Sequence, residues 1–122
     1  MSELKEGHLV LPNLFTLTGN PEVRWRPWRD GVEICALHEQ ENQGSSSALL
    51  RYAPGARIPQ HEHVGYEHII VLAGSQSDEH GTYRTGTLVI NPPGRRHTVH
   101  SAEGCTVLAI WQQPVRFVGD GS

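Results

Sequence analysis

The sequence is poor in cysteine and carries little net charge. Its 122 residues include two cysteines, Cys35 and Cys105, which lie far apart in the chain. In the cytoplasmic protein that we expect, this usage favours two buried thiols over a disulfide. The formal net charge of −3 comes from 10 basic and 13 acidic residues, so the charge balance predicts neither a nucleic-acid nor a membrane partner.

Long apolar runs and helical periodicity are also missing. No apolar stretch approaches the ~18 residues that a membrane-spanning helix requires. Residues 1–6 lack the basic and apolar regions of a signal peptide, so we expect none. The sequence shows no internal repeat, and its length suits a single domain with one hydrophobic core.

Turn-forming residues and histidine are abundant instead. Thirteen glycines and eight prolines separate short apolar runs, a pattern typical of an all-β protein. About eight to ten short strands at regular spacing predict a sandwich or barrel. We divide the chain into an N-terminal arm or edge strand (1–20), a β-barrel (21–117) and a C-terminal tail (118–122). The eight histidines are the main oddity of the composition.

Several strands can be placed from the pattern alone. Residues 32–37 and 105–111 are apolar runs typical of strands, and residues 112–117 are expected to pair at an edge. His8–Pro12 is predicted as a short edge strand, with Pro12 limiting its hydrogen bonding. Asp78, Glu79 and His80 are assigned to a turn rather than to a metal site.

The first candidate site lies between Gly55 and Gly74. His61, His63 and Glu67 have the same parity, so on one strand they would project from one face. Two imidazoles and a carboxylate on one face suit a borderline divalent cation better than a hydrophobic core. Metal binding is favoured further because a buried cluster of such groups without an ion or other partners is costly.

A second segment supplies a fourth candidate ligand. Thr87–Ile90 is typical of a short strand, and Asn91–Gly94 predicts a tight turn because of its prolines and glycine. His97 then begins the next strand, from which its imidazole would complete the coordination shell. His68 and His100 have the opposite parity to the nearest ligands, so both are expected to face outward.

Basic and aromatic residues alternate in Trp25–Arg29. Such a pattern can stack on single-stranded nucleic acid. It also fits a surface or dimer-contact strand in which arginine stems cover the indoles, and we favour this second interpretation because no wider basic patch accompanies it. Three further aromatic residues are assigned to packing rather than to a pocket wall: Tyr52, Tyr83 and Trp111.

Both candidate segments resemble the cupin motifs. The first cupin motif is G, five residues, HxH, three residues, E, six residues, G, and the matching positions are Gly55, His61, His63, Glu67 and Gly74. The second is G, five residues, PxG, two residues, H, and is matched by Gly86, Pro92, Gly94 and His97. In the cupin pattern this histidine is followed, after three further residues, by Asn, and here that position holds Ser101.

Further segments resemble the ChrR-type cupin domain found at the C-terminus of some zinc-dependent anti-sigma factors. These segments are Tyr52–Gly55, Val71–Gly74, Ser77–Gly81 and Asn91–Gly94. The sigma-binding region of those proteins is a separate helical domain with its own His/Cys zinc site, and the sequence shows no such motif. The resemblance therefore implies a single-domain cupin, a jelly-roll barrel or double-stranded β-helix, together with its metal site.

The resemblance also implies the ligands. His61, His63, Glu67 and His97 would bind one divalent metal ion per chain, zinc or iron foremost, with manganese and nickel as alternatives. An octahedral ion would keep two positions for water, dioxygen or a bidentate substrate, and the bound ion would act as a Lewis acid. A small-molecule ligand or substrate would then enter the barrel.

Three functions are open from the sequence. The first is a metal-dependent, dioxygenase-like enzyme acting on a small carbonyl or aromatic substrate. The second is a non-catalytic sensor or regulatory module, and the third is a metal-bound structural domain. No non-ligand acid or base stands out, and no partner-binding segment is evident. We expect a homodimer, because small cupins pair through edge strands and free edges are a liability.

Overall fold

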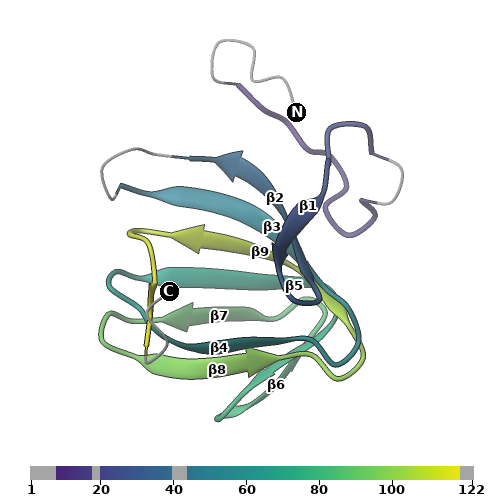
Figure 1. Cartoon of the computed structure of the whole chain (residues 1–122). Helices are drawn as coiled ribbons and strands as arrows, with labels where there is room; N and C mark the ends of the chain where they lie inside the picture. The colour runs from purple at the N-terminus through teal and green to yellow at the C-terminus, as the bar shows by residue number, and fades with distance from the viewer. Residues whose placement is uncertain (1–7, 18–19, 40–43, 119–122) are drawn as a thin grey trace.

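The protein folds as one curled antiparallel sheet that forms a half-barrel (Figure 1). A computed structural model describes residues 8–17, 20–39 and 44–118. Those residues form ten strands and no helix, as the all-β prediction required. In chain order the strands are β1 Arg26–Arg29, β2 Val32–His38, β3 Ser46–Tyr52, β4 Arg57–Glu62, β5 Glu67–Asp78, β6 Gly81–Arg84, β7 Leu88–Asn91, β8 Arg96–His100, β9 Cys105–Trp111 and β10 Arg116–Phe117.

The strand order is β1-β2-β3-β9-β5-β8-β4-β10, with β6 and β7 also paired to β5. The 12-residue β5 lies at the centre of this arrangement and pairs with four strands. After β9 the chain crosses one open end of the half-barrel, and β10 pairs with β4 on the other side (Figure 1). This crossing places the C-terminal strand beside the candidate metal ligands.

Alternation along the strands divides the apolar residues between two faces. The inner face holds the main core, which includes Val32, Leu50, Val71 and Val107, all at most 2% exposed. On the outer face a smaller cluster around Leu49 is covered by apolar side chains from residues 11–25. Burying each large apolar side chain stabilises the fold by about 1.5–3 kcal/mol, so the inner core supplies most of the stability.

Two motif positions have structural roles. Gly74 adopts a φ of +73°, and a Cβ atom there would overlap the carbonyl oxygen of Gly104, so only glycine fits. Ser101, which stands where the cupin pattern has Asn, is fully buried, and its hydroxyl donates to the Ser75 carbonyl at 2.6 Å. Its backbone also bonds to the turn at Gly55, so Ser101 joins the end of β8 to two neighbouring segments.

The expectation that one strand carries residues 61–67 is wrong. β4 ends at Glu62 and β5 begins at Glu67. His63 leaves the β4 ladder because its backbone bonds to the turn before β8: its N–H donates to Arg95 O at 2.9 Å, and its carbonyl accepts from Gly94 N–H at 2.7 Å. The first motif therefore spans a strand, a connection and the start of a second strand.

Most other strand predictions are confirmed. β2 and β9 cover residues 32–37 and 105–111, and residues 112–117 contain the edge-paired β10. His8–Pro12 is not a strand, since only residue 8 forms an isolated bridge. The described residues include no helix with the length and apolar character needed to cross a membrane. The division of the chain at residues 20 and 117 stays a prediction.

Candidate metal centre

Several strand ends meet at one end of the half-barrel. The register pairs Glu67, the first residue of β5, with Asn91 at the end of β7 and with Trp111 at the end of β9. On the adjoining ladder, His61 of β4 faces His97 of β8. Antiparallel pairing thus gathers polar side chains that are widely separated in the sequence.

Three histidines converge there. One nitrogen from each of His61, His63 and His97 lies within 4.8 Å of the others, a grouping that could hold a metal ion. The Nε2 atoms of His63 and His97 are 2.9 Å apart. All three side chains are at most 5% exposed, so the structure brings together, inside the fold, three of the four residues predicted as ligands.

Hydrogen bonds orient two of the rings. Nδ1 of His61 lies 2.9 Å from the Pro59 carbonyl oxygen, which can only accept, so this nitrogen carries the proton and Nε2 has a free lone pair. Nδ1 of His97 lies 3.2 Å from Oδ2 of Asp78, which has the same effect on that ring. Such outer partners fix the tautomer of metal-binding histidines. Nδ1 of His63 is buried and has no hydrogen-bond partner among the residues that the structure describes.

Glu67 lies beside the three histidines rather than among them. Its Oε1 is 3.4 Å from Nε2 of His63. Asn91 Nδ2 donates to this oxygen at 2.9 Å, and Trp111 Nε1 donates to the other oxygen at 2.6 Å. The two hydrogen bonds hold the carboxylate in place and leave Oε1 with a second lone pair.

Burial controls the charge of the cluster. It lowers the pKa of His61 to about 4 and that of His63 to about 3, because the low-dielectric interior disfavours the imidazolium. Burial also lowers the pKa of His97, although Asp78 opposes the shift. The pKa of Glu67 rises to about 7, since burial outweighs the hydrogen bonds from Trp111 and Asn91. Near neutral pH the three imidazoles are therefore uncharged, and each can donate a nitrogen lone pair to a metal ion.

Asp78 is the site residue that the sequence analysis missed. Its Oδ1 accepts from the His80 N–H at 2.8 Å, as the turn assignment predicted. Its Oδ2 contacts His97 and also pairs with Arg95 at 3.2 Å. Burial favours the neutral acid, but the hydrogen bonds from the His80 N–H, Tyr83 and His97 hold the pKa of Asp78 below its usual value. No local spacing signals this role, because Asp78 reaches His97 only through the pairing of β5 with β8.

A small cavity adjoins the cluster. Its volume is about 20 Å³, enough for roughly one water molecule. His61, His97 and Glu67 line it together with the aromatic rings of Tyr52 and Trp111, so these two rings form part of a pocket wall, contrary to their assignment to packing alone. The third aromatic residue of that assignment, Tyr83, packs against the core and donates to Asp78.

Most of the remaining candidates lie away from the cavity. His68 and His100 are half-exposed at ladder positions next to the inward residues, as their parity predicted. Cys35 and Cys105 are buried free thiols, as expected. Of the two indoles in residues 25–29, Trp28 is contacted by an arginine of the same segment, with Cζ of Arg29 5.6 Å from its ring centroid, and it also lines the cavity. Trp25 is covered instead by Arg51 of β3, whose Cζ lies 4.4 Å from the ring centroid.

A half-barrel of antiparallel strands with inward histidines defines a cupin. Solved structures agree with this class. An RmlC-like cupin protein from Ralstonia eutropha superposes with a TM-score of 0.72 at 23% identity, covering 86% of this chain and 72% of the other. An acetylacetone dioxygenase from Acinetobacter johnsonii gives a TM-score of 0.74 at 16% identity, covering 100% of this chain and 88% of the other.

Sequence comparison narrows the class. The model of the ChrR Cupin-like domain matches residues 16–115. The anti-sigma-E factor ChrR of Cereibacter sphaeroides is 33% identical over 99 residues, or 79% of this chain. The chain spans only 45% of the length of that relative. This protein therefore belongs to the ChrR cupin-like family.

Proposed function

We propose that His61, His63, His97 and Glu67 bind one divalent metal ion. The observation that carries the proposal is the convergence of three buried, neutral imidazoles on one point. Neutral imidazole is the form that donates a lone pair to a metal. Three neutral ligands and one carboxylate around a divalent ion give a site of net charge near +1.

The distances within the cluster fit an ion. Two nitrogens bound at about 2.1 Å lie roughly 3.0 Å apart around an octahedral ion and about 3.4 Å apart around a tetrahedral one. The Nε2 atoms of His63 and His97 are 2.9 Å apart, and Oε1 of Glu67 is 3.4 Å from the former. Both separations lie near the values expected for two ligands of one ion. Iron or zinc suits this donor set, and manganese or nickel are alternatives.

As a function we propose dioxygenase-like chemistry on a small carbonyl or aromatic substrate. A bound ion would supply Lewis acidity and, with iron, access to dioxygen. The chain itself would position the ion through Asp78 and Pro59, exclude water with the apolar cavity wall and hold Glu67 through Trp111. The shared fold with an acetylacetone dioxygenase is a fold-level analogy in favour of this chemistry.

A regulatory module is the second candidate. The identity of 33% to a protein named as an anti-sigma factor favours it. Oxygen uptake separates the two functions: iron-loaded protein that consumes oxygen with a 1,3-diketone or an aromatic ketone supports the enzyme. Stoichiometric metal binding with no oxygen uptake for either substrate class supports the regulatory module.

The metal assignment is tested by removing two ligands. The double variant His61→Ala/His63→Ala should lose its metal and the stabilisation that metal gives the folded state. The matched control is His68→Ala/His100→Ala, which removes two half-exposed imidazoles and should retain about one ion per chain. Elemental analysis and melting temperatures provide the measurements. An unchanged metal content in the first variant would refute the assignment.

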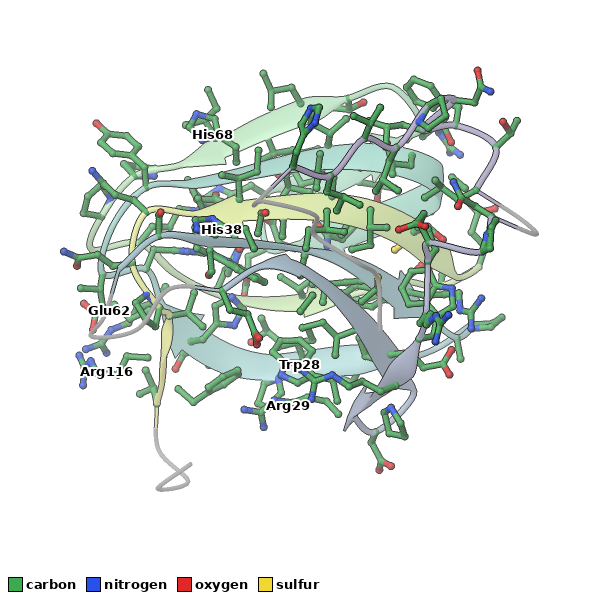
Figure 2. The ribbon with its side chains drawn as sticks, turned by 90° about the horizontal axis from the view of Figure 1, so that it is seen from above. Trp28, Arg29, His38, Glu62, His68 and Arg116 are labelled. Carbon is green, nitrogen blue, oxygen red and sulfur yellow. The ribbon has the colours of Figure 1, made fainter. Side chains whose placement is uncertain are left out.

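We also propose a cytoplasmic homodimer. The two free, buried thiols suit a reducing compartment. Leu88 and Ile90 of β7 and Ile110 of β9 are 41–55% exposed on the outer face of the sheet, where a second copy of the chain would cover them. His68 lies on this outer side, across the sheet from Trp28 (Figure 2). A monomeric mass by light scattering at micromolar concentration would contradict the dimer.

A further inference from the structure

A larger hollow lies directly outside the metal-site cavity. It has a volume of about 340 Å³, at the lower end of the range for small-molecule pockets. We call this hollow the vestibule. Its wall is formed by residues of β1, β2, β3 and β9 and of the segment that leads to β10. Its apolar part includes Ile34, Ala36, Ala48 and Pro114.

Four side chains separate the vestibule from the inner cavity. Trp28, Trp111, Val115 and Phe117 line both spaces. Phe117 contacts two side chains of other strands: Cζ of Arg29 lies 3.7 Å from its ring centroid, and the His61 ring lies 5.6 Å away, centroid to centroid. The inner cavity of about 20 Å³ holds little more than a water molecule or an ion, so a larger ligand does not fit there, and the adjoining vestibule provides the space.

The wall of the vestibule indicates the ligand. Two indoles and a phenyl ring contribute to the wall, and such aromatic surface favours contact with a planar ring. Among the described wall residues the charged side chain is Glu39, which pairs with Arg26 at 3.8 Å, so the wall offers no unpaired charge to an ionic ligand and an uncharged one fits it better. His38, Ser46 and Ser47 provide polar groups near the outer part of the hollow, where they can bond to a hydroxyl or carbonyl oxygen.

Phe117, one of these four side chains, lies on β10, and few contacts hold β10 in place. β10 is two residues long, and its pairing with β4 is reinforced by the Arg116–Glu62 ion pair and by the bond from Val118 N–H to the Gln60 carbonyl. Glu62 and Arg116 lie together at the edge of the molecule (Figure 2). Short, solvent-exposed elements open locally at a small cost in free energy. A ligand in the vestibule would therefore reach the histidines when Phe117 moves aside.

We propose that the vestibule is a binding site for an uncharged, planar molecule of one or two aromatic rings that bears a hydroxyl or carbonyl oxygen. The inference names a substrate class for the proposed enzyme, and only the conversion of the bound molecule rests on that proposed function. Occupancy of the vestibule itself needs neither a metal ion nor turnover.

Calorimetric titration with 2-naphthol tests the site. Two analogues serve as comparisons: decahydro-2-naphthol, which has the same ring skeleton without planarity, and 2-naphthalenesulfonate, which keeps the planar rings but carries an anionic sulfonate in place of the hydroxyl. Both should bind about tenfold more weakly than 2-naphthol, or worse. Equal affinity for all three would overturn the proposal.

The three tryptophans locate the ligand. Trp28 and Trp111 line the vestibule, whereas Trp25 packs in the cluster on the other face of the sheet. In a nitrogen–proton correlation spectrum, 2-naphthol should shift the indole signals of Trp28 and Trp111 and leave that of Trp25 in place. The variant Trp28→Phe assigns the first signal. A shift of Trp25 alone, or no shift at saturation, would contradict the site.

A space-filling variant separates this inference from the metal assignment. Ala36→Phe places a ring in the vestibule and should weaken 2-naphthol binding at least about tenfold with unchanged metal content. Ala102→Phe, at an exposed bend, is the matched control with unchanged affinity. Should Ala36→Phe not fold, Ser46→Phe at the half-buried start of β3 serves the same purpose. Full affinity in the folded variant would sink the inference, whereas metal retained by His61→Ala/His63→Ala would sink only the metal assignment.

Discussion

The same strand pair, β4 with β8, builds two different environments. Toward one end Ile58 faces Val99, and both belong to the apolar core. Toward the other end His61 faces His97, and both are buried with lowered pKa values. The first pair stabilises the fold, because it removes apolar surface from water. The second buries polar groups, which is unfavourable unless partners compensate.

The difference separates the proposed metal site from the core that supports it. The apolar pair can be exchanged for others of similar volume with little effect on chemistry. The histidine pair requires its outer partners, Pro59 and Asp78, to fix the tautomer and orientation of each ring, whereas burial keeps the rings neutral. The apolar end of the β4–β8 pair therefore supports the histidine end. Substitutions at the apolar end should mainly lower stability, and substitutions around the histidines should mainly lower metal affinity.

The largest effect is expected in the core. Ile58→Ala should lower the free energy of unfolding of the metal-free protein by about 2–5 kcal/mol, because it leaves a cavity in a packed interior. Metal content at saturation should stay at about one ion per chain. Urea denaturation and elemental analysis measure the two quantities. The exposed Val10→Ala variant should change stability by less than about 0.5 kcal/mol. A comparable loss of stability in both variants would show that Ile58 does not contribute to a packed core.

A smaller effect is expected from the outer partner of His97. Asp78→Asn should weaken metal affinity about 10–100-fold, since the amide holds the ring less firmly and lowers its basicity. Asp30→Asn, in the exposed turn after β1, makes the same chemical change away from the site. Competition with a chelator gives both affinities. Identical affinities would show that Asp78 does not support the site.

The pH dependence of the stability of the metal-free protein gives a third, smaller contrast. Burial lowers the pKa values of His61 and His63 to about 4 and about 3 from 6.5. Between pH 6.5 and about 4 the unfolded chain binds more protons than the folded one, so the free energy of unfolding falls as the pH drops. The raised pKa of Glu67 acts in the opposite direction, but His97 adds to the histidine effect.

Urea midpoints at pH 7 and pH 5 measure this dependence. The midpoint of the metal-free protein should be lower at pH 5, and His61→Ala/His63→Ala should show a weaker change. A midpoint that rises on acidification would mean that the histidines are not buried as neutral rings.

Local patterns predict much of the fold. The apolar run at residues 105–111 and the turn at 91–94 are fixed by side-chain type and by proline and glycine, and both predictions are confirmed. The break between β4 and β5 is not predicted, because His63 bonds to Arg95 and Gly94, which lie about 30 residues away in the sequence. The register between strands that are distant in the sequence cannot be predicted from a short stretch of residues.

The site shows the same limit. Spacing singles out His61, His63 and His97, which the structure brings together. It cannot place Asp78, whose carboxylate reaches His97 through the curl of the sheet. Nor can it show that Trp111 binds the Glu67 carboxylate, because the two residues meet only through the pairing of β5 with β9.

The most direct test is a crystal structure of the metal-loaded protein with anomalous scattering data. We expect one strong peak per chain between the rings of His61, His63 and His97, at about 2.0–2.2 Å from one nitrogen of each and from an oxygen of Glu67. No peak among the three rings of fully loaded protein, or an ion bound elsewhere on the chain, would contradict the account.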